Sequence, residues 1–257
     1  MPIVITMNFD ISDLLNHWEY QAGQIVVRRF KGKDGKEKIQ LRVDLGLLQM
    51  DAFGRPDGKK PFGHETLFEH FKARLQKHMD ANGGEEEGFK LDAEDCSKLQ
   101  QEAIQFHHRY ICLFQLKDYA AVVRDTERNI DVFDFVEKYA EQREMAWSVQ
   151  QLRPQLLMMQ VRAKATMALD SGDHDGALQA AEDGMEELRQ FYARIERPDL
   201  SDQSAEIQSL QAYMEEIRST RPISERERLE QSLSEAVARE DYEKAAELRD
   251  KLRKLAD

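Results

Sequence analysis

The sequence predicts a mainly α-helical protein of the α+β class. A small N-terminal domain with a β-hairpin is expected to precede an irregular stack of αα-hairpins, which ends in a further helical hairpin. Two strand-like segments lie within the first 45 residues. From Leu91 onward, apolar residues recur at spacings of three and four, the period of an amphipathic helix. The chain has only 13 glycines and 6 prolines in 257 residues, so few loops are expected.

Charge is unevenly distributed along the chain. The net charge is −12, and 33% of the residues are charged. Residues 1–80 contain 13 basic and 11 acidic residues, whereas residues 81–257 contain 24 and 38. An acidic helical body repels phosphate. Any nucleic-acid binding is therefore expected in the N-terminal part.

The predicted compartment is the cytoplasm. Cys96 and Cys112 are too few for a disulfide framework, which favours a reducing environment. No apolar run approaches the roughly 20 residues that span a bilayer. The opening MPIVITMNFD has neither the basic start nor the cleavage site of a signal peptide. We expect no membrane association.

The two predicted strands are residues 24–31 (QIVVRRFK) and 37–45 (EKIQLRVDL), because apolar and polar residues alternate in the second. The Asp-Gly pair at 34–35 lies between them, and its glycine supplies the positive φ of a tight turn. A lone hairpin is marginally stable in water. We expect this one to pack on the aromatic-bearing segment 13–20 or on a helix over 64–79.

Basic residues are concentrated in and after this hairpin. Residues 28–60 contain ten basic and five acidic residues. One interpretation is a surface that contacts phosphate or an acidic partner. The alternative is a solvated hairpin whose charged edges resist aggregation. The ten residues are Arg28, Arg29, Lys31, Lys33, Lys36, Lys38, Arg42, Arg55, Lys59 and Lys60.

The predicted domain organisation has four parts. The N-terminal α+β domain covers residues 1–81, and an acidic, glycine-bearing linker covers 82–90. A helical body follows over 91–219, and a C-terminal helical hairpin covers 220–257.

Three turns between predicted helices share one pattern, in which an aspartate is followed by a ring and then by small or apolar residues. The segments are LKDYAAVV (116–123), SGDHDGAL (171–178) and REDYEKAA (239–246). We expect each aspartate to cap the following helix and each ring to wedge between the helices of its pair. The aspartates are Asp118, Asp173 and Asp241, and the rings are Tyr119, His174 and Tyr242.

Other helix boundaries follow from the same periodicity. The helix that begins near Tyr119 is expected to run to about Gln150, and a further helix is expected over about 201–219. Ser224 and Glu227 fit a capping box at the start of the last pair.

The first two helix pairs resemble tetratricopeptide repeats. SGDHDGAL is similar to the small-Gly-Asp-aromatic-x-x-Ala turn of that family, whereas the first pair has Leu116 and Lys117 where glycine is usual. The three aspartates are 55 and 68 residues apart, so the stack is not a regular solenoid. The resemblance implies a concave protein-binding surface and no chemistry.

The closing segment, residues 227–255, resembles the UVR motif of the B and C subunits of the bacterial excision nuclease. The motif also occurs in Clp-type ATPases and in an activator of a protein arginine kinase. The matching residues are Leu229, Ala236, Glu240, Asp241, Tyr242, Glu243, Ala245, Ala246, Leu248, Arg249, Asp250 and Leu252. The resemblance implies a bacterial protein and a hairpin that pairs with another hairpin. The hairpin can also dock on its own helical body. The expected partner-binding residues are Leu229, Leu233, Val237, Tyr242, Ala245, Leu248, Arg249 and Leu252.

No signature of catalysis occurs in the chain. The sequence contains no P-loop, Rossmann glycine fingerprint, HExxH or GxSxG. Its seven histidines are scattered, and we expect no metal and no cofactor. The predicted function is a non-enzymatic adaptor that binds protein partners or itself. Two alternatives remain: a nucleic-acid-associated accessory factor related to DNA repair, and a regulator of a Clp protease or a protein arginine kinase.

Overall fold

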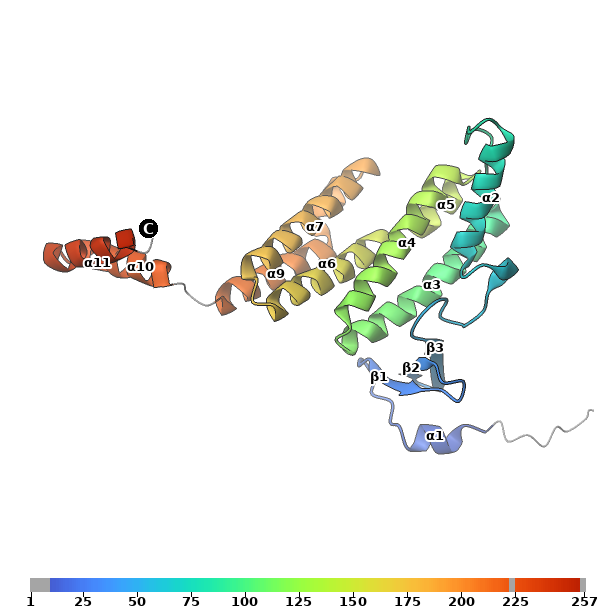
Figure 1. Cartoon of the computed structure of the whole chain (residues 1–257), viewed down its shortest axis with the longest axis horizontal. Coiled ribbons are helices and arrows are strands. Elements are labelled where there is room, and N and C mark those ends of the chain that lie inside the picture. Colours follow the sequence, from blue (N-terminus) through green and yellow to red (C-terminus); the bar gives the residue numbers. More distant parts are fainter. Residues whose placement is uncertain (1–9, 222–224, 255–257) are drawn as a thin grey trace, which may run out of the picture. The chain divides into compact units, whose positions relative to one another are not determined.

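The computed structural model describes residues 10–221 and 225–254. It confirms a mainly α-helical chain with a small antiparallel sheet near its N-terminus and a helical hairpin near its C-terminus (Figure 1). The chain divides into two compact units, Met1–Gln211 and Ala212–Asp257. Ser224 of the predicted capping box lies outside the described residues, as does the side chain of Glu227.

The sheet has three antiparallel strands in the order β1-β2-β3. The predicted hairpin is confirmed, and Gly35 in its turn has φ +76°. The third strand was not predicted, because its sequence GLLQMD has two adjacent leucines and no clear alternation. Leu45, expected in the second strand, lies in the turn between β2 and β3 with 89% of its surface exposed. The first elements are α1 (Ser12–Asn16), β1 (Val26–Lys31), β2 (Glu37–Val43) and β3 (Gly46–Asp51).

One face of the sheet packs on helices α3 (Ala93–Gln115) and α4 (Tyr119–Tyr139). Ile39 and Met50 are buried there with Tyr110 of α3 and Val122 of α4. The prediction that segment 13–20 packs on the hairpin is confirmed, on the other face of the sheet. Segment 13–20 places Trp18 on the opposite face of the sheet, 4.2 Å below the Arg28 guanidinium.

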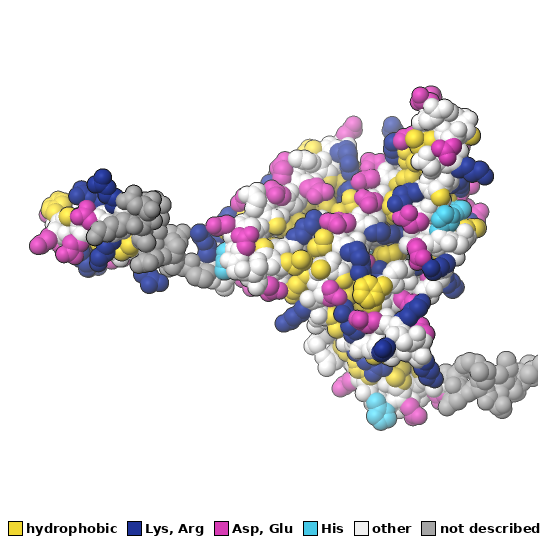
Figure 2. All heavy atoms as spheres, viewed as in Figure 1, with side chains coloured by type: hydrophobic (Ala, Val, Ile, Leu, Met, Phe, Trp, Pro, Cys, Tyr) yellow, Lys and Arg dark blue, Asp and Glu magenta, His cyan; other side chains and the backbone are white. Residues whose placement is uncertain are grey.

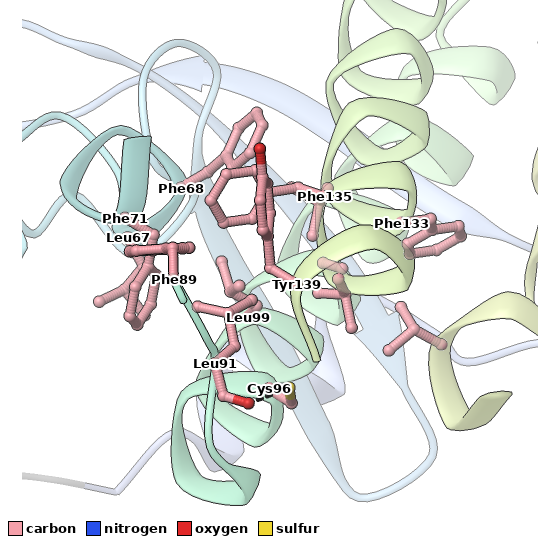
Figure 3. Close-up of a cluster of buried hydrophobic side chains, with 14 of the residues drawn as sticks. Leu67, Phe68, Phe71, Phe89, Leu91, Cys96, Leu99, Phe133, Phe135 and Tyr139 are labelled. Atoms are coloured by element: carbon pink, nitrogen blue, oxygen red, sulfur yellow. Dashed lines mark hydrogen bonds between the residues drawn. The ribbon is translucent and has the colours of Figure 1, made fainter. Parts of the chain in front are cut away.

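The second expected support, the helix over 64–79, is α2 (Leu67–Ala81), preceded by a short 3₁₀ turn η1 (Pro61–Gly63). It contributes Phe68 and Phe71 to a different core, formed with α3, α4 and α5 (Figure 3). Aromatic rings dominate this core. The Phe68 and Phe135 ring centroids are 5.5 Å apart in an edge-to-face arrangement, which favours ring pairs.

Helix α4 ends at Tyr139, so the predicted continuation to Gln150 is wrong. Ala140 is extended with ψ 131°, because the backbone there pairs with Leu91. The Leu91 N–H donates to Tyr139 O over 2.8 Å, and the Glu141 N–H donates to Leu91 O over 2.9 Å. A separate helix, α5 (Arg143–Gln150), follows this bridge.

The helices α3, α4, α6 (Arg153–Asp170) and α7 (His174–Arg194) each pack on the next in that order. The helix predicted over 201–219 is two helices, α8 (Asp199–Gln203) and α9 (Ala205–Thr220). Ser204 separates them, and its Oγ accepts a hydrogen bond from the Ile207 N–H over 3.2 Å. Ser204 therefore caps α9.

The three aspartate turns share one geometry. Asp118, Asp173 and Asp241 accept a hydrogen bond from the N–H three residues later, over 3.3, 2.8 and 3.2 Å. These contacts confirm the predicted caps. The wedge prediction is wrong for Tyr242, whose side chain is 70% exposed. Tyr119 does pack, edge-to-face on Phe114 with centroids 5.3 Å apart.

Buried charges connect the loop after β3 to the helices. Arg109 is buried and forms a bidentate ion pair with Asp125 at 2.7 and 2.9 Å. Its Nη1 donates to the carbonyl oxygens of Asp51 and Gly54. Buried Glu102 accepts from the N–H groups of Leu67 and Phe68 at the start of α2. The sheet, α2 and the helical layers thus share contacts, and the proposed division at residues 82–90 stays a prediction.

Candidate protein-binding hairpin

The C-terminal hairpin has its own small core. Helices α10 (Glu225–Ala238) and α11 (Tyr242–Lys254) enclose the buried residues Ala236, Ala245 and Leu248. Leu229 and Leu233 pack against them. The two alanines have no side chain beyond Cβ, so the helices can approach closely at these positions.

The turn between α10 and α11 repeats the geometry of the two earlier turns. Glu240 has φ +58°, and the Asp241 N–H donates to Ala236 O over 2.9 Å. The Asp241 carboxylate then caps α11 at the Lys244 N–H. Because these contacts are local, the sequence from Ala236 to Lys244 fixes the bend of the hairpin.

The eight expected partner-binding residues differ in how accessible they are. Leu229, Leu233, Ala245 and Leu248 lie between the two helices, so they stabilise the hairpin itself. Leu252 is half-buried, whereas Val237, Tyr242 and Arg249 are exposed. A partner can reach the exposed group without opening the hairpin. Partner binding by any of the eight stays a prediction.

Val237 and Tyr242 flank the turn. Val237 is 52% exposed and its carbonyl oxygen accepts from the Glu240 N–H over 3.0 Å. Tyr242 is the first residue of α11. Large apolar side chains are therefore exposed at the end of the hairpin where the two helices meet. The face of the hairpin seen in Figure 2 is otherwise rich in charged side chains. Tyrosine is among the residue types that dominate binding energies at protein interfaces.

Most of the ten basic residues of the N-terminal region are engaged in internal contacts. Arg29 pairs with Glu37 at 2.9 Å and with Asp118 at 2.6 Å. Arg42 is buried and donates to the carbonyl oxygens of Trp18, Asp44 and Gly46. The other contacts pair Lys36 and Lys38 with Asp51, Arg55 with Glu102, Lys60 with Glu65, and Arg28 with Gln40.

Three of the ten, Lys31, Lys33 and Lys59, are exposed and form no ion pair with any residue that the structure describes. Basic and acidic side chains are interspersed over the face of the molecule seen in Figure 2. Such mixing gives a weak electrostatic attraction for a polyanion compared with a continuous basic surface. Contact of these residues with phosphate or an acidic partner stays a prediction.

Two buried cysteines and two half-buried histidines, His107 and His108, lie in the helical layers. Burial raises the pKa of Cys96 to about 11 and that of Cys112 to about 12, so both thiols are protonated at neutral pH. His107 Nδ1 lies 2.6 Å from the Tyr110 hydroxyl, and burial together with nearby His108 lowers the pKa of His107. Within residues 10–221 and 225–254, no group of three His, Cys, Asp or Glu side chains is placed to hold a metal ion. No helix among the described residues is long and apolar enough to cross a membrane.

Comparison with known proteins identifies one module in this chain. A protein-family profile, the UvrB/uvrC motif, matches residues 224–257, the segment that contains α10 and α11. Comparisons with curated proteins and with solved structures gave no significant match. The chain therefore carries a UVR motif at its C-terminal hairpin, a module that generally mediates protein–protein interactions.

Proposed function

We propose that this protein is a non-enzymatic adaptor that binds a protein partner, or a second copy of itself, through its C-terminal hairpin. The observation that carries the proposal is the UVR motif at residues 224–257, in which Val237 and Tyr242 are exposed beside a closed internal core. The closed core provides a folded element. The exposed pair provides apolar surface that a partner can cover.

Binding of a partner to the hairpin is expected to be favourable, because the hairpin alone has little buried apolar surface. Among the described side chains of the hairpin, whose helices have 14 and 13 residues, three apolar ones are buried. Helices of this length are marginally stable on their own. Covering a large apolar side chain contributes about 1.5–3 kcal/mol, so covering Val237 and Tyr242 stabilises both the complex and the hairpin.

The class of partner is proposed from the family resemblance alone. Components related to the excision nuclease, a Clp protease and a protein arginine kinase are the alternatives that it suggests, and a bacterial origin belongs to the same inference. The tetratricopeptide-like character of the earlier helix pairs is also part of the proposal. Nucleic-acid binding is not favoured, because most of the basic residues in question have internal partners.

The test replaces the exposed pair and leaves the hairpin core intact. Val237→Ser with Tyr242→Ala is expected to weaken partner capture or self-association at least tenfold, since tenfold corresponds to about 1.4 kcal/mol. Circular dichroism should show unchanged helicity. Glu247→Ala, also exposed on α11, is the matched control and should bind as the wild type does.

Leu248 is unsuitable as a test position. Its side chain is buried between α10 and α11, so Leu248→Glu is expected to unfold the hairpin and to abolish binding for that reason alone. Full binding by the Val237→Ser, Tyr242→Ala variant, in pull-down and in light scattering, would reject the proposed surface.

A further inference from the structure

A groove without charged side chains lies between α3, α4 and the junction of α5 with α6. Its volume is about 270 Å³, and all of its lining belongs to the unit Met1–Gln211. Ala103, Phe133 and Leu156 form a buried apolar floor. Ile104 and Leu152 line the groove with 40% and 37% of their surfaces exposed.

The absence of charge in this lining is unusual for this chain. Charged residues make up 33% of the sequence, so twelve lining residues drawn evenly from it would include about four. None of the twelve is Asp, Glu, Lys or Arg. The apolar floor is continuous with the core that packs α3 against α4. The groove is therefore shaped by the same packing that holds the helices together.

The polar groups of the groove are neutral and several are held in place. Gln100 Nε2 and Gln151 Nε2 both donate to Ser148 O over 3.1 Å. Buried Asn129 donates to Ala103 O over 2.9 Å. These bonds use the amide nitrogens. The side-chain oxygens of Gln100 and Gln151 can therefore accept hydrogen bonds from a ligand.

This composition selects among ligands by charge. A carboxylate, phosphate or ammonium group would lose its water here and would meet no opposite charge, which is strongly unfavourable. A peptide group is neutral and carries both a donor and an acceptor that match amide side chains. The volume is near the lower limit of about 300 Å³ for ligand pockets. It suits one large side chain and its backbone better than a whole cofactor.

We propose that this groove binds an uncharged stretch of extended polypeptide, anchored by one aliphatic or aromatic side chain at Ile104 and Leu152. The inference rests on the adaptor function in one respect, namely that the ligand is a protein segment. The groove lies in the other compact unit from the hairpin. Binding at the groove and binding at the hairpin can therefore be tested, and rejected, separately.

The experiment selects binders to the full chain from a library of random twelve-residue peptides. Selected peptides are expected to share an uncharged segment around one aliphatic or aromatic residue. Amide resonances of residues 100–110 and 148–156 are expected to shift in the ¹⁵N–¹H spectrum when such a peptide is added.

Variants assign the binding to the groove. Ile104→Glu places a charge at the anchor position and should weaken peptide binding at least tenfold, whereas Ile104→Met should retain it. Met167→Glu is the matched control, because Met167 is a similarly exposed apolar residue of the same helical layers and is not part of the groove lining. The Val237→Ser, Tyr242→Ala variant should bind the peptide as the wild type does.

Several outcomes would overturn the inference. They are a failure to select any binder, binders with charged residues at the anchor, or binding that Ile104→Glu leaves unchanged. Self-association lost in Ile104→Glu, without peptide binding, would assign the groove to a second copy of the chain instead. If no binding depends on the hairpin while the peptide still binds the groove, the adaptor proposal is rejected and the groove result stands.

Discussion

At the scale of single residues, the three aspartate turns depend on backbone conformations that favour glycine. The residue before each aspartate has positive φ: +60° at Lys117, +81° at Gly172 and +58° at Glu240. Each aspartate N–H then donates to the carbonyl oxygen five residues earlier, over 2.9 Å in all three turns. This backbone pattern closes the preceding helix while the aspartate side chain starts the next. Only one of the three turns has the residue that adopts the conformation without strain.

Replacing Lys117 by glycine is therefore expected to raise the free energy of unfolding by about 1 kcal/mol, because a side chain in the left-handed region costs about 1–2 kcal/mol. Lys117→Ala keeps Cβ and should change little. Gly172→Ala should lower the free energy of unfolding by about the same amount. Urea unfolding of the three variants checks this, and equal stability of Lys117→Gly and Lys117→Ala would contradict it.

His107 gives a second expectation at this scale. Burial and nearby His108 lower the pKa of His107 in the folded state, whereas an unfolded histidine titrates near 6.5. The unfolded chain therefore takes up the proton first as the pH falls. The contribution of this neutral histidine to stability is complete above about pH 6.5 and is lost below it. His107→Gln should flatten the dependence of the unfolding free energy on pH as the pH falls below about 6.5, and an unchanged slope would exclude this role.

At the scale of elements, buried ion pairs join segments that are distant in the sequence. Arg109 of α3 and Asp125 of α4 are both buried, and Arg109 also donates to one carbonyl oxygen at the end of β3 and to one in the loop that follows. Arg124 contacts the same Asp125 carboxylate at 3.0 Å, but its side chain is 43% exposed. The two arginines thus contact the same carboxylate and differ in burial, so the effects of replacing each one can be compared directly.

Arg109→Met is expected to lower the free energy of unfolding by about 3–5 kcal/mol, because Asp125 would remain buried with only the half-exposed Arg124 to pair with. Arg124→Met should cost at most about 1 kcal/mol, since exposed ion pairs contribute little. The double variant Arg109→Met, Asp125→Leu should recover part of the loss. Urea unfolding measures all three, and similar losses for the two arginine variants would refute the assignment.

At this scale the sequence predicts regular elements better than their breaks. The alternation over Ile39, Leu41 and Val43 is a local signal, and the strand is present. The end of α4 at Tyr139 depends on a backbone pairing with Leu91, almost 50 residues earlier, which no local pattern encodes. The third strand, GLLQMD, has two adjacent leucines and buries the neighbours Met50 and Asp51, so the period of two that marks a half-buried strand is missing from its sequence.

At the scale of the whole molecule, the sequence identified the C-terminal hairpin but not which of its residues are accessible. Leu248 and Tyr242 both fit the family pattern, yet the first is buried in the hairpin and the second is exposed. Apolar periodicity alone does not distinguish an internal contact from an external one, because both lie on one helical face. The uncharged groove was missed for a related reason. It combines residues of four helices, and none of them is unusual in its own segment.

The most direct test of protein binding by the hairpin is affinity capture from the native host with the full chain and with a chain that ends at Thr220. This cut removes the hairpin and keeps α9 complete. Proteins bound specifically by the full chain should be lost from the shortened chain and from the Val237→Ser, Tyr242→Ala variant, and should be retained by Glu247→Ala. An identical set of bound proteins for the full and the shortened chain would contradict protein binding by the hairpin.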